Sequence, residues 1–131
     1  MADHPNAERV RKMFRAFREG DVATILAIIP EDAVWHFPGR RGQLAGEHRG
    51  RQAIFAFLMK VQSLTGHTFH LDLLDVLAND THAVALFHGN ATRNGKTLSN
   101  PTCLRMRLEG DQVVEVWEFV WDLYHVDDFW A

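Results

Sequence analysis

Two side chains of this sequence are suited to acid–base chemistry near neutral pH. Glu118 is a carboxylate inside the apolar run 113–121, and His36 lies in the apolar segment 33–37. Burial among apolar side chains disfavours the charged form of a carboxyl group, so it raises the pKa into the range useful to a general acid or base. An imidazole ionises near this range without perturbation. We therefore take Glu118 as the candidate acid or base and His36 as its assistant.

Each of the two residues also has a purely structural interpretation. Glu118 could pair with an Arg or a His. It could also point outward while Trp117 and Phe119 point inward, because a one-residue bulge exchanges the two faces of a strand. His36 could be a polar residue at a strand end, bonded to the glycine-rich segment that follows it. The residues alone leave these alternatives open.

Other kinds of chemistry are not indicated. The chain has eight histidines, but none shows metal-ligand spacing; His67 and His70, for example, are three apart on an expected strand and so lie on opposite faces. Neither of the glycine-rich phosphate-binding patterns, GxGxxG or GK[ST], follows a strand. Cys103 is most simply a small buried hydrophobe. We expect no metal and no other cofactor.

The composition is that of an ordinary globular protein. The chain has 131 residues, of which 47% are hydrophobic and 24% charged, so we expect one domain over residues 1–131. A formal net charge of −3 argues against nucleic acid as a partner. No apolar run approaches the ~20 residues that span a bilayer, and the first residues carry no signal-peptide core. These features predict a cytoplasmic protein that does not bind membranes.

The pattern of apolar residues changes from helical to strand-like along the chain. Helical spacing covers residues 6–19, 22–29 and 51–64, with a short strand at 33–37. Four glycines predict a loop throughout 39–50. Four strands joined by turn signals then follow, at 68–77, 82–92, 96–108 and 112–121, with Asn94-Gly95 as the strongest hairpin turn. This order predicts an α+β fold with the helices on one face of an antiparallel sheet.

The last of these strands is apolar on both faces. An antiparallel strand with one wet face would alternate between apolar and polar residues. We expect a second copy of the chain to cover the outer face, with Trp117, Phe119 and Trp121 as anchors if they point outward. The sequence therefore predicts a homodimer through the outer face of the sheet.

Four segments together resemble the nuclear transport factor 2-like (NTF2-like) superfamily, in particular its SnoaL-like and ketosteroid-isomerase-like branch. They are Glu19-Gly20-Asp21, AVWHFPG at 33–39, GEHRGRQAIFAF at 46–57 and VVEVWEFVWDLYHVDDFW at 113–130. The resemblance implies a cone, in which a curved antiparallel sheet packs against three N-terminal helices around an apolar pocket. Because the superfamily includes isomerases, cyclases, dehydratases and non-catalytic proteins, the fold alone does not name a function.

The resemblance also implies which side chains face the pocket. It places Glu118 in the wall and His36 beside the mouth, and it gives Asn100 and Thr102 the role of orienting a ligand by hydrogen bonds. The other expected substrate-binding residues are apolar: Met13, Phe17, Trp35, Phe37, Phe87, Leu104, Val116 and Val120.

The comparison with ketosteroid isomerases excludes their usual mechanism. Met13, Phe37 and Leu104 stand where those enzymes have a Tyr and two Asp, and none of the three can move a proton or donate a hydrogen bond from its side chain. We expect a cofactor-independent isomerase-, cyclase-, dehydratase- or hydrolase-type enzyme acting on a small hydrophobic carbonyl or polyketide-like compound. The alternatives are a non-catalytic binder of an apolar small molecule and a dimerisation module.

Overall fold

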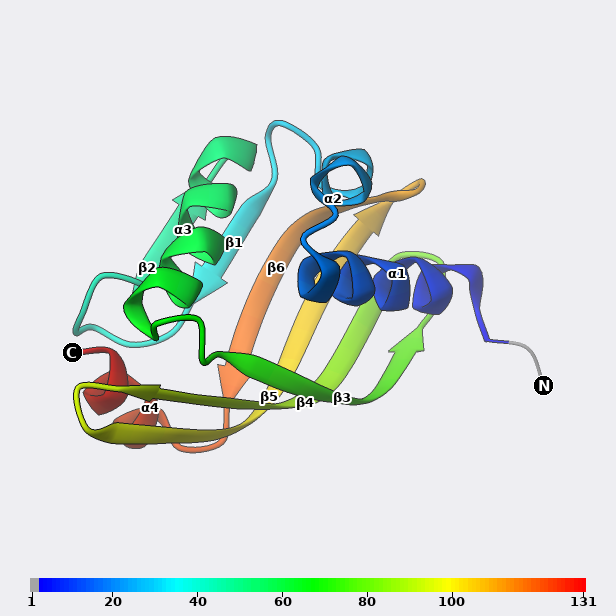
Figure 1. Cartoon of the computed structure of the whole chain (residues 1–131). Helices are drawn as coiled ribbons and strands as arrows, with labels where there is room; N and C mark the ends of the chain where they lie inside the picture. The colour runs from blue at the N-terminus through cyan, green and yellow to red at the C-terminus, as the bar shows by residue number, and fades with distance from the viewer. Residues whose placement is uncertain (1–2) are drawn as a thin grey trace.

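A curved, open six-stranded sheet forms the body of the molecule in a computed structural model that describes residues 3–131. The elements are α1 (Pro5–Glu19), α2 (Val22–Ile28), β1 (Val34–Phe37), β2 (Gly46–Arg49), α3 (Arg51–Leu64), β3 (His70–Ala78), β4 (His82–Arg93), β5 (Lys96–Glu109), β6 (Gln112–Val120) and α4 (Leu123–Trp130). The strand order is β2-β1-β6-β5-β4-β3. Figure 1 shows α1, α2 and α3 on the concave side of the sheet. The predicted α+β cone is confirmed.

The first two helices begin and end where the sequence predicts. Val10, Met13 and Ala16 recur at helical spacing and form the buried stripe of α1. Gly20 ends α1 with a φ of +70°, and its N–H donates to the carbonyls of Ala16 and Phe17. Asp21 then caps α2 by accepting a hydrogen bond from the backbone N–H of Thr24 at 3.2 Å.

Strands β3 to β6 form the expected antiparallel meander, but the other end of the sheet departs from the prediction. β1 pairs with β6 in parallel, with Trp35 opposite Val116. Residues Gly46–Arg49, expected to lie in a loop, form β2 and pair antiparallel with β1. This edge strand is short and mostly exposed. Backbone hydrogen bonds to β1 hold it, so its sequence needs no alternation of apolar and polar residues and gives no strand signal.

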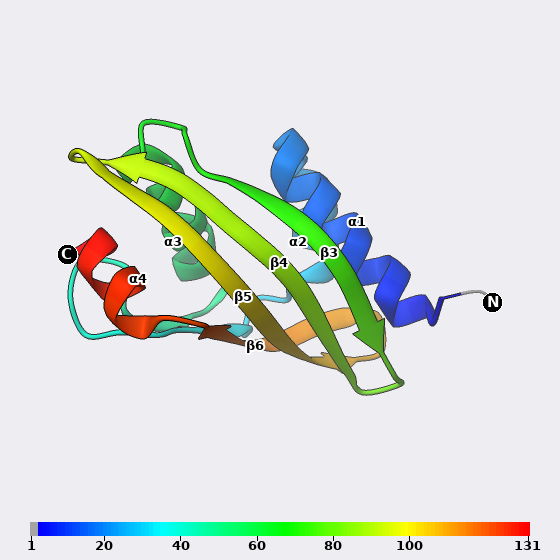
Figure 2. The same cartoon turned by 90° about the horizontal axis from the view of Figure 1, so that it is seen from below.

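The segment after β6 forms a helix, α4, that is not among the elements predicted from the sequence. Asp122 caps it by accepting from the N–H of His125 at 3.1 Å, and Phe129 and Trp130 are buried. Arg93 donates to the carbonyl of Phe129 at 3.0 Å, and Lys96 donates to that of Asp128 at 2.8 Å. These contacts hold α4 against the β4–β5 hairpin, at one end of the sheet (Figure 2).

None of the helices formed by residues 3–131 combines the length and the apolar character that crossing a bilayer requires.

Candidate functional site

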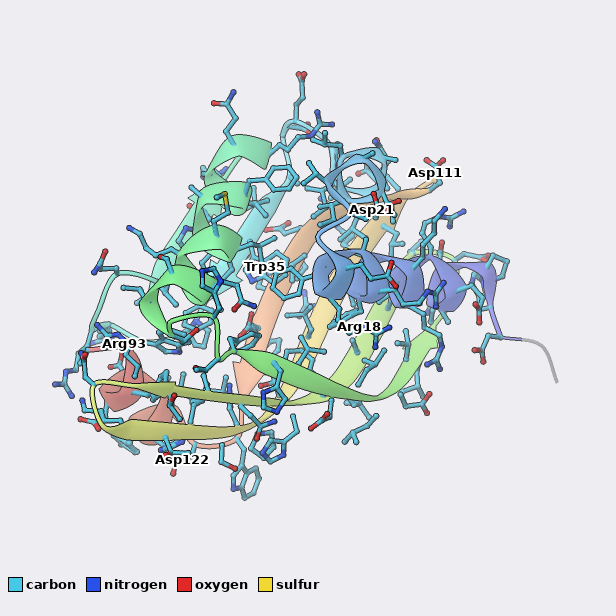
Figure 3. All side chains as sticks on the ribbon, in the orientation of Figure 1. Arg18, Asp21, Trp35, Arg93, Asp111 and Asp122 are labelled. Carbon is cyan, nitrogen blue, oxygen red and sulfur yellow. The ribbon has the colours of Figure 1, made fainter. Side chains whose placement is uncertain are left out.

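A cavity lies between the concave face of the sheet and the helices. Its space is about 800 Å³, open solvent at its mouth included. Almost all of its lining is apolar, and the side chains of Glu118 and Asn100 are the polar exceptions. Figure 3 shows Trp35 in the space between α1 and α3. The lining residues are Met13, Phe14, Phe17, Ile25, Ile29, Trp35, Phe37, Phe57, Leu58, Val61, Phe69, Leu71, Phe87, Gly89, Leu98, Asn100, Leu104, Glu118 and Trp130.

Glu118 faces the cavity because the register of β6 is regular around it. Its neighbours in the pairing with β5 run without a shift from Thr102 opposite Val120 to Arg107 opposite Glu115. The irregularity in this pair of strands lies beyond Arg107, on the hairpin side. No bulge therefore turns Glu118 outward, and Trp117 takes the opposite face.

Within the described part of the chain, the carboxyl group of Glu118 has one hydrogen-bond donor, the indole of Trp35. Trp35 Nε1 donates to Glu118 Oε1 at 3.2 Å. Burial among apolar side chains raises the pKa of Glu118 to about 7, and the hydrogen bond from Trp35 opposes this rise by stabilising the carboxylate. Near neutral pH both forms of Glu118 are populated, as a group that accepts and returns a proton requires.

Asn100 is the other polar group in the cavity wall. The residue is only 6% exposed, and its Oδ1 atom accepts no hydrogen bond from any of the described residues. Leaving a buried acceptor unpaired costs on the order of 1–3 kcal/mol, so such atoms call for a partner. A hydroxyl or amine of a bound ligand would supply that partner.

The structure brings eight of the twelve predicted site residues to the cavity. They are Met13, Phe17, Trp35, Phe37, Phe87, Asn100, Leu104 and Glu118. Thr102 is buried next to the cavity instead, and its hydroxyl donates to the carbonyl of Asn100 at 3.1 Å. Val116 lies in the core and Val120 packs against it. These three residues support the wall without lining it.

The expected position of His36 beside the cavity mouth must be corrected. His36 alternates along β1 with Trp35 and Phe37, which both face the cavity, so its own side chain takes the outer face. There its Nε2 lies 2.7 Å from Glu115 Oε2, and its ring stacks on Trp117 with 5.4 Å between centroids. His36 therefore has no route to a ligand in the cavity.

Sequence reasoning missed several aromatic side chains of the wall. Phe14 and Phe57 lie in the apolar stripes recognised on their helices, but the stripes do not tell a cavity residue from a core residue. Trp130 joins the wall because α4 folds back on the sheet. The spacing of Val126, Phe129 and Trp130 was the available sign of that helix.

Between residues 3 and 131, no three His, Cys, Asp or Glu side chains come together as a metal site would require.

Comparison with known proteins places this geometry in a family. The model of the SnoaL-like domain matches residues 10–116. The chain belongs to this SnoaL-like family of NTF2-like proteins. The solved structure of Bal32a, from a soil-derived mobile gene cassette, is 38% identical with a TM-score of 0.91, and the match covers 96% of each chain.

Two further proteins are similar to this chain over their whole length or nearly so. The Uncharacterized protein Rv0034 of Mycobacterium tuberculosis is 30% identical over the whole of both chains. A putative SnoaL-like polyketide cyclase from Jannaschia sp. CCS1 is 15% identical, with a TM-score of 0.80 over 99% of this chain and 96% of that one. At this identity the likeness shows the shared fold alone.

The position of Glu118 predicts how stability depends on pH. Its pKa in the folded chain is about 7 against an ordinary 4.5, so folding favours the protonated form. That contribution is fully present below pH 4.5 and is lost as the pH rises through 7. At 1.36 kcal/mol per pKa unit the loss is about 3 kcal/mol. We expect Glu118→Gln to remove it, measured as the free energy of unfolding in urea between pH 4 and 9.

The control for this measurement is Glu109→Gln, which removes an exposed carboxylate at the end of β5. The difference between wild type and this control should stay nearly constant with pH over the same range. A Glu118→Gln variant whose stability runs parallel to wild type from pH 4 to 9 would show that the carboxyl group is solvated.

Proposed function

We propose that the protein is a cofactor-independent enzyme that moves a proton on a small apolar carbonyl compound held in the cavity, with Glu118 as the proton acceptor and donor. One observation carries this proposal: among residues 3–131, Glu118 is the single ionisable side chain of the cavity wall, and it sits among apolar groups with Trp35 fixing its carboxylate. A preorganised base in an apolar site is suited to removing a proton next to a carbonyl group.

The proposed step needs no partner beyond the substrate. The Glu118 carboxylate takes a proton from the carbon next to the carbonyl, and the electron pair of the broken C–H bond forms the C=C bond of an enolate. The carbonyl oxygen then carries the negative charge. When the enolate is conjugated, return of the proton from Glu118 to a different carbon gives an isomer. Alternatively, the enolate carbon attacks a second carbonyl carbon within the substrate and closes a ring, and the alkoxide formed there takes the proton back from Glu118. The amide of Asn100 would orient the substrate through a hydrogen bond.

The second candidate is a non-catalytic binder of an apolar molecule. Met13, Phe37 and Leu104 favour it, because all three line the cavity where a proton donor for the carbonyl oxygen would be useful. In this case Asn100 and the apolar wall would select the ligand, and Glu118 would be a hydrogen-bonding group.

Proton exchange distinguishes the two candidates. The protein is incubated in D₂O with a panel of cyclic and aromatic ketones, and loss of the protons next to the carbonyl is followed by NMR. Catalysed exchange that disappears in Glu118→Gln supports the enzyme. A ketone that raises the melting temperature but exchanges no faster than in buffer supports the binder.

We also propose that the protein forms a homodimer through the outer face of the sheet. No helix of the described chain covers β3, β4 and β5 on this side in Figure 2. Two large apolar side chains beside this face are exposed: Phe119 in β6 is 51% exposed, and Trp121, just after β6, is 84% exposed. The same face carries both signs of charge, for example Arg105 over the Trp117 ring and Glu115 beside it in β6. A face of mixed charge can pair with its own copy about a two-fold axis.

Replacing Trp121 with glutamate should therefore convert dimer to monomer, because an exposed apolar anchor becomes a buried charge in the interface. Light scattering coupled to size exclusion measures the mass. Tyr124→Glu in α4, where the side chain is 89% exposed, is the matched control and should leave the dimer intact. A wild-type protein that is monomeric at tens of micromolar would contradict the proposal.

A further inference from the structure

A cleft between α1, the end of α3 and β3 lies next to the cavity. The side chains of Phe14, Phe17, Phe69 and Leu71 line both spaces, so the two are adjacent. A ligand longer than the cavity could reach past these shared side chains into the cleft. The remaining residues of the cleft are Arg11, Arg15, Arg18, Gln62, His70 and Leu73.

This cleft is basic in a protein that is acidic overall. Arg11, Arg15 and Arg18 lie at helical spacing along one side of α1, and no Asp or Glu is among the lining residues. The chain as a whole has a formal net charge of −3. The positive charge of the cleft is therefore a local feature and does not follow from the composition of the chain.

Two of the three arginines are available to a ligand. Arg11 is held by Asp3 at 3.3 Å and by Asp75 at 2.9 Å. Arg15 and Arg18 are exposed, and their side chains form no hydrogen bond or ion pair with residues 3–131. Figure 3 shows Arg18 beside α1, toward the side where β3 runs. Each guanidinium offers a planar set of N–H donors that matches a carboxylate.

We propose that the natural ligand is an amphipathic carboxylate, whose apolar body fills the cavity and whose carboxylate lies in the cleft against Arg15 and Arg18. The proposal rests on the proposed function only in using the same cavity, and it holds for a substrate and for a ligand that is bound unchanged. The apolar wall would supply most of the affinity, since it is the part of the site from which water is displaced. The arginines would select the charged end and orient it outward.

The expected contribution of the arginines is modest because they are exposed. Ion pairs at a solvated surface are weak and are screened by salt. We expect the pair to tighten binding of a carboxylate by about three- to tenfold at low ionic strength, and less at 0.5 M salt. A neutral ligand of the same shape should not respond to either arginine.

Paired probes test this directly. 2-Naphthylacetate and 2-naphthylacetamide have the same apolar body, and only the first is charged. Their dissociation constants are measured by calorimetry for wild type, for Arg15→Gln/Arg18→Gln, and for the control Lys12→Gln/Lys60→Gln. Lys12 and Lys60 are exposed on α1 and α3 and lie outside the cleft lining, so the control removes the same net charge.

The inference predicts that wild type and the control prefer the naphthylacetate and that the arginine variant binds both probes alike. Equal binding of the two probes by wild type would overturn it, as would failure of both to bind. A loss of preference of the same size in the lysine control would overturn it too, because the effect would then come from net charge. Glu118→Gln separates the proposals: it should slow proton exchange and leave the preference for the carboxylate in place.

Discussion

Replacing Glu118 with glutamine is expected to slow proton exchange on an accepted ketone by about 10²- to 10⁴-fold, the usual contribution of a positioned acid or base. Glutamine has nearly the same shape, and its Oε1 can still accept the hydrogen bond that Trp35 Nε1 donates over 3.2 Å. The variant therefore loses the proton acceptor without opening a space in the wall. Substrate binding should change little, so the effect should fall on kcat more than on KM.

The pH dependence of the same reaction gives a second readout. A base must be deprotonated to act, and burial raises the pKa of Glu118 to about 7. The exchange rate of wild type should rise with pH through about 7 and then level off, while the residual rate of Glu118→Gln should lack this step. Glu115→Gln is the control, because Glu115 lies on the same strand with its carboxylate against His36 on the outer face. Proton exchange at the wild-type rate in Glu118→Gln would show that the carboxylate is not the base.

Most of the fold could be predicted because its signals are local. The apolar stripes of α1 and α3 and the Asn94-Gly95 turn each specify a conformation within a few residues. β2 and α4 could not be predicted in this way. β2 exists because β1 offers it backbone bonds, and α4 is held by Arg93 and Lys96 of the β4–β5 hairpin, which lie 36 and 32 residues before the carbonyls that they bond.

For the candidate site, the alternation of side chains along a strand predicts which face a residue takes, but not whether that residue lines the cavity. Alternation puts Glu118 and Trp35 on the cavity face once the register is known, but it also puts His36 on the outer face, between two cavity residues of β1. A strand-end position near a pocket therefore says nothing about the direction of the side chain. Thr102, Val116 and Val120 are on the same face of their strands as Glu118 and still do not line the cavity: Val116 lies in the core, Val120 packs against it, and Thr102 is buried.

The unpaired Oδ1 of Asn100 and the basic cleft could not be predicted from the sequence, because both depend on how distant segments pack together. The amide was a candidate from the sequence, but the lack of a partner for its oxygen depends on every side chain around it. The arginines of α1 prompted no prediction from the sequence, because they line a cleft only once β3 and α3 are folded beside them. Binding specificity is thus encoded in packing between elements that are distant in sequence, and it leaves little trace in any one segment.

The wall of the cavity at α4 packs closely against the backbone of Gly42. Gly42 has a φ of +75°, and a methyl group in place of its hydrogen would overlap the carbonyl oxygen of Trp130. That oxygen belongs to the backbone at the end of α4, so it cannot move aside as a flexible side chain would. Gly42→Ala should push α4 away from the loop and draw Trp130, which lines the cavity, out of its buried position.

Gly95→Ala isolates this effect from backbone strain. Gly95 has nearly the same φ, +76°, but nothing lies within 4 Å of the added methyl group. Both variants lose about 1–2 kcal/mol from a left-handed alanine, and Gly42→Ala should lose a further ~1–3 kcal/mol from overpacking. Urea unfolding measures the two losses, and near-ultraviolet circular dichroism reports the aromatic packing at α4. Equal losses in the two variants would mean that α4 yields freely, and Trp130 would then be a movable cover of the cavity and not a fixed part of its wall.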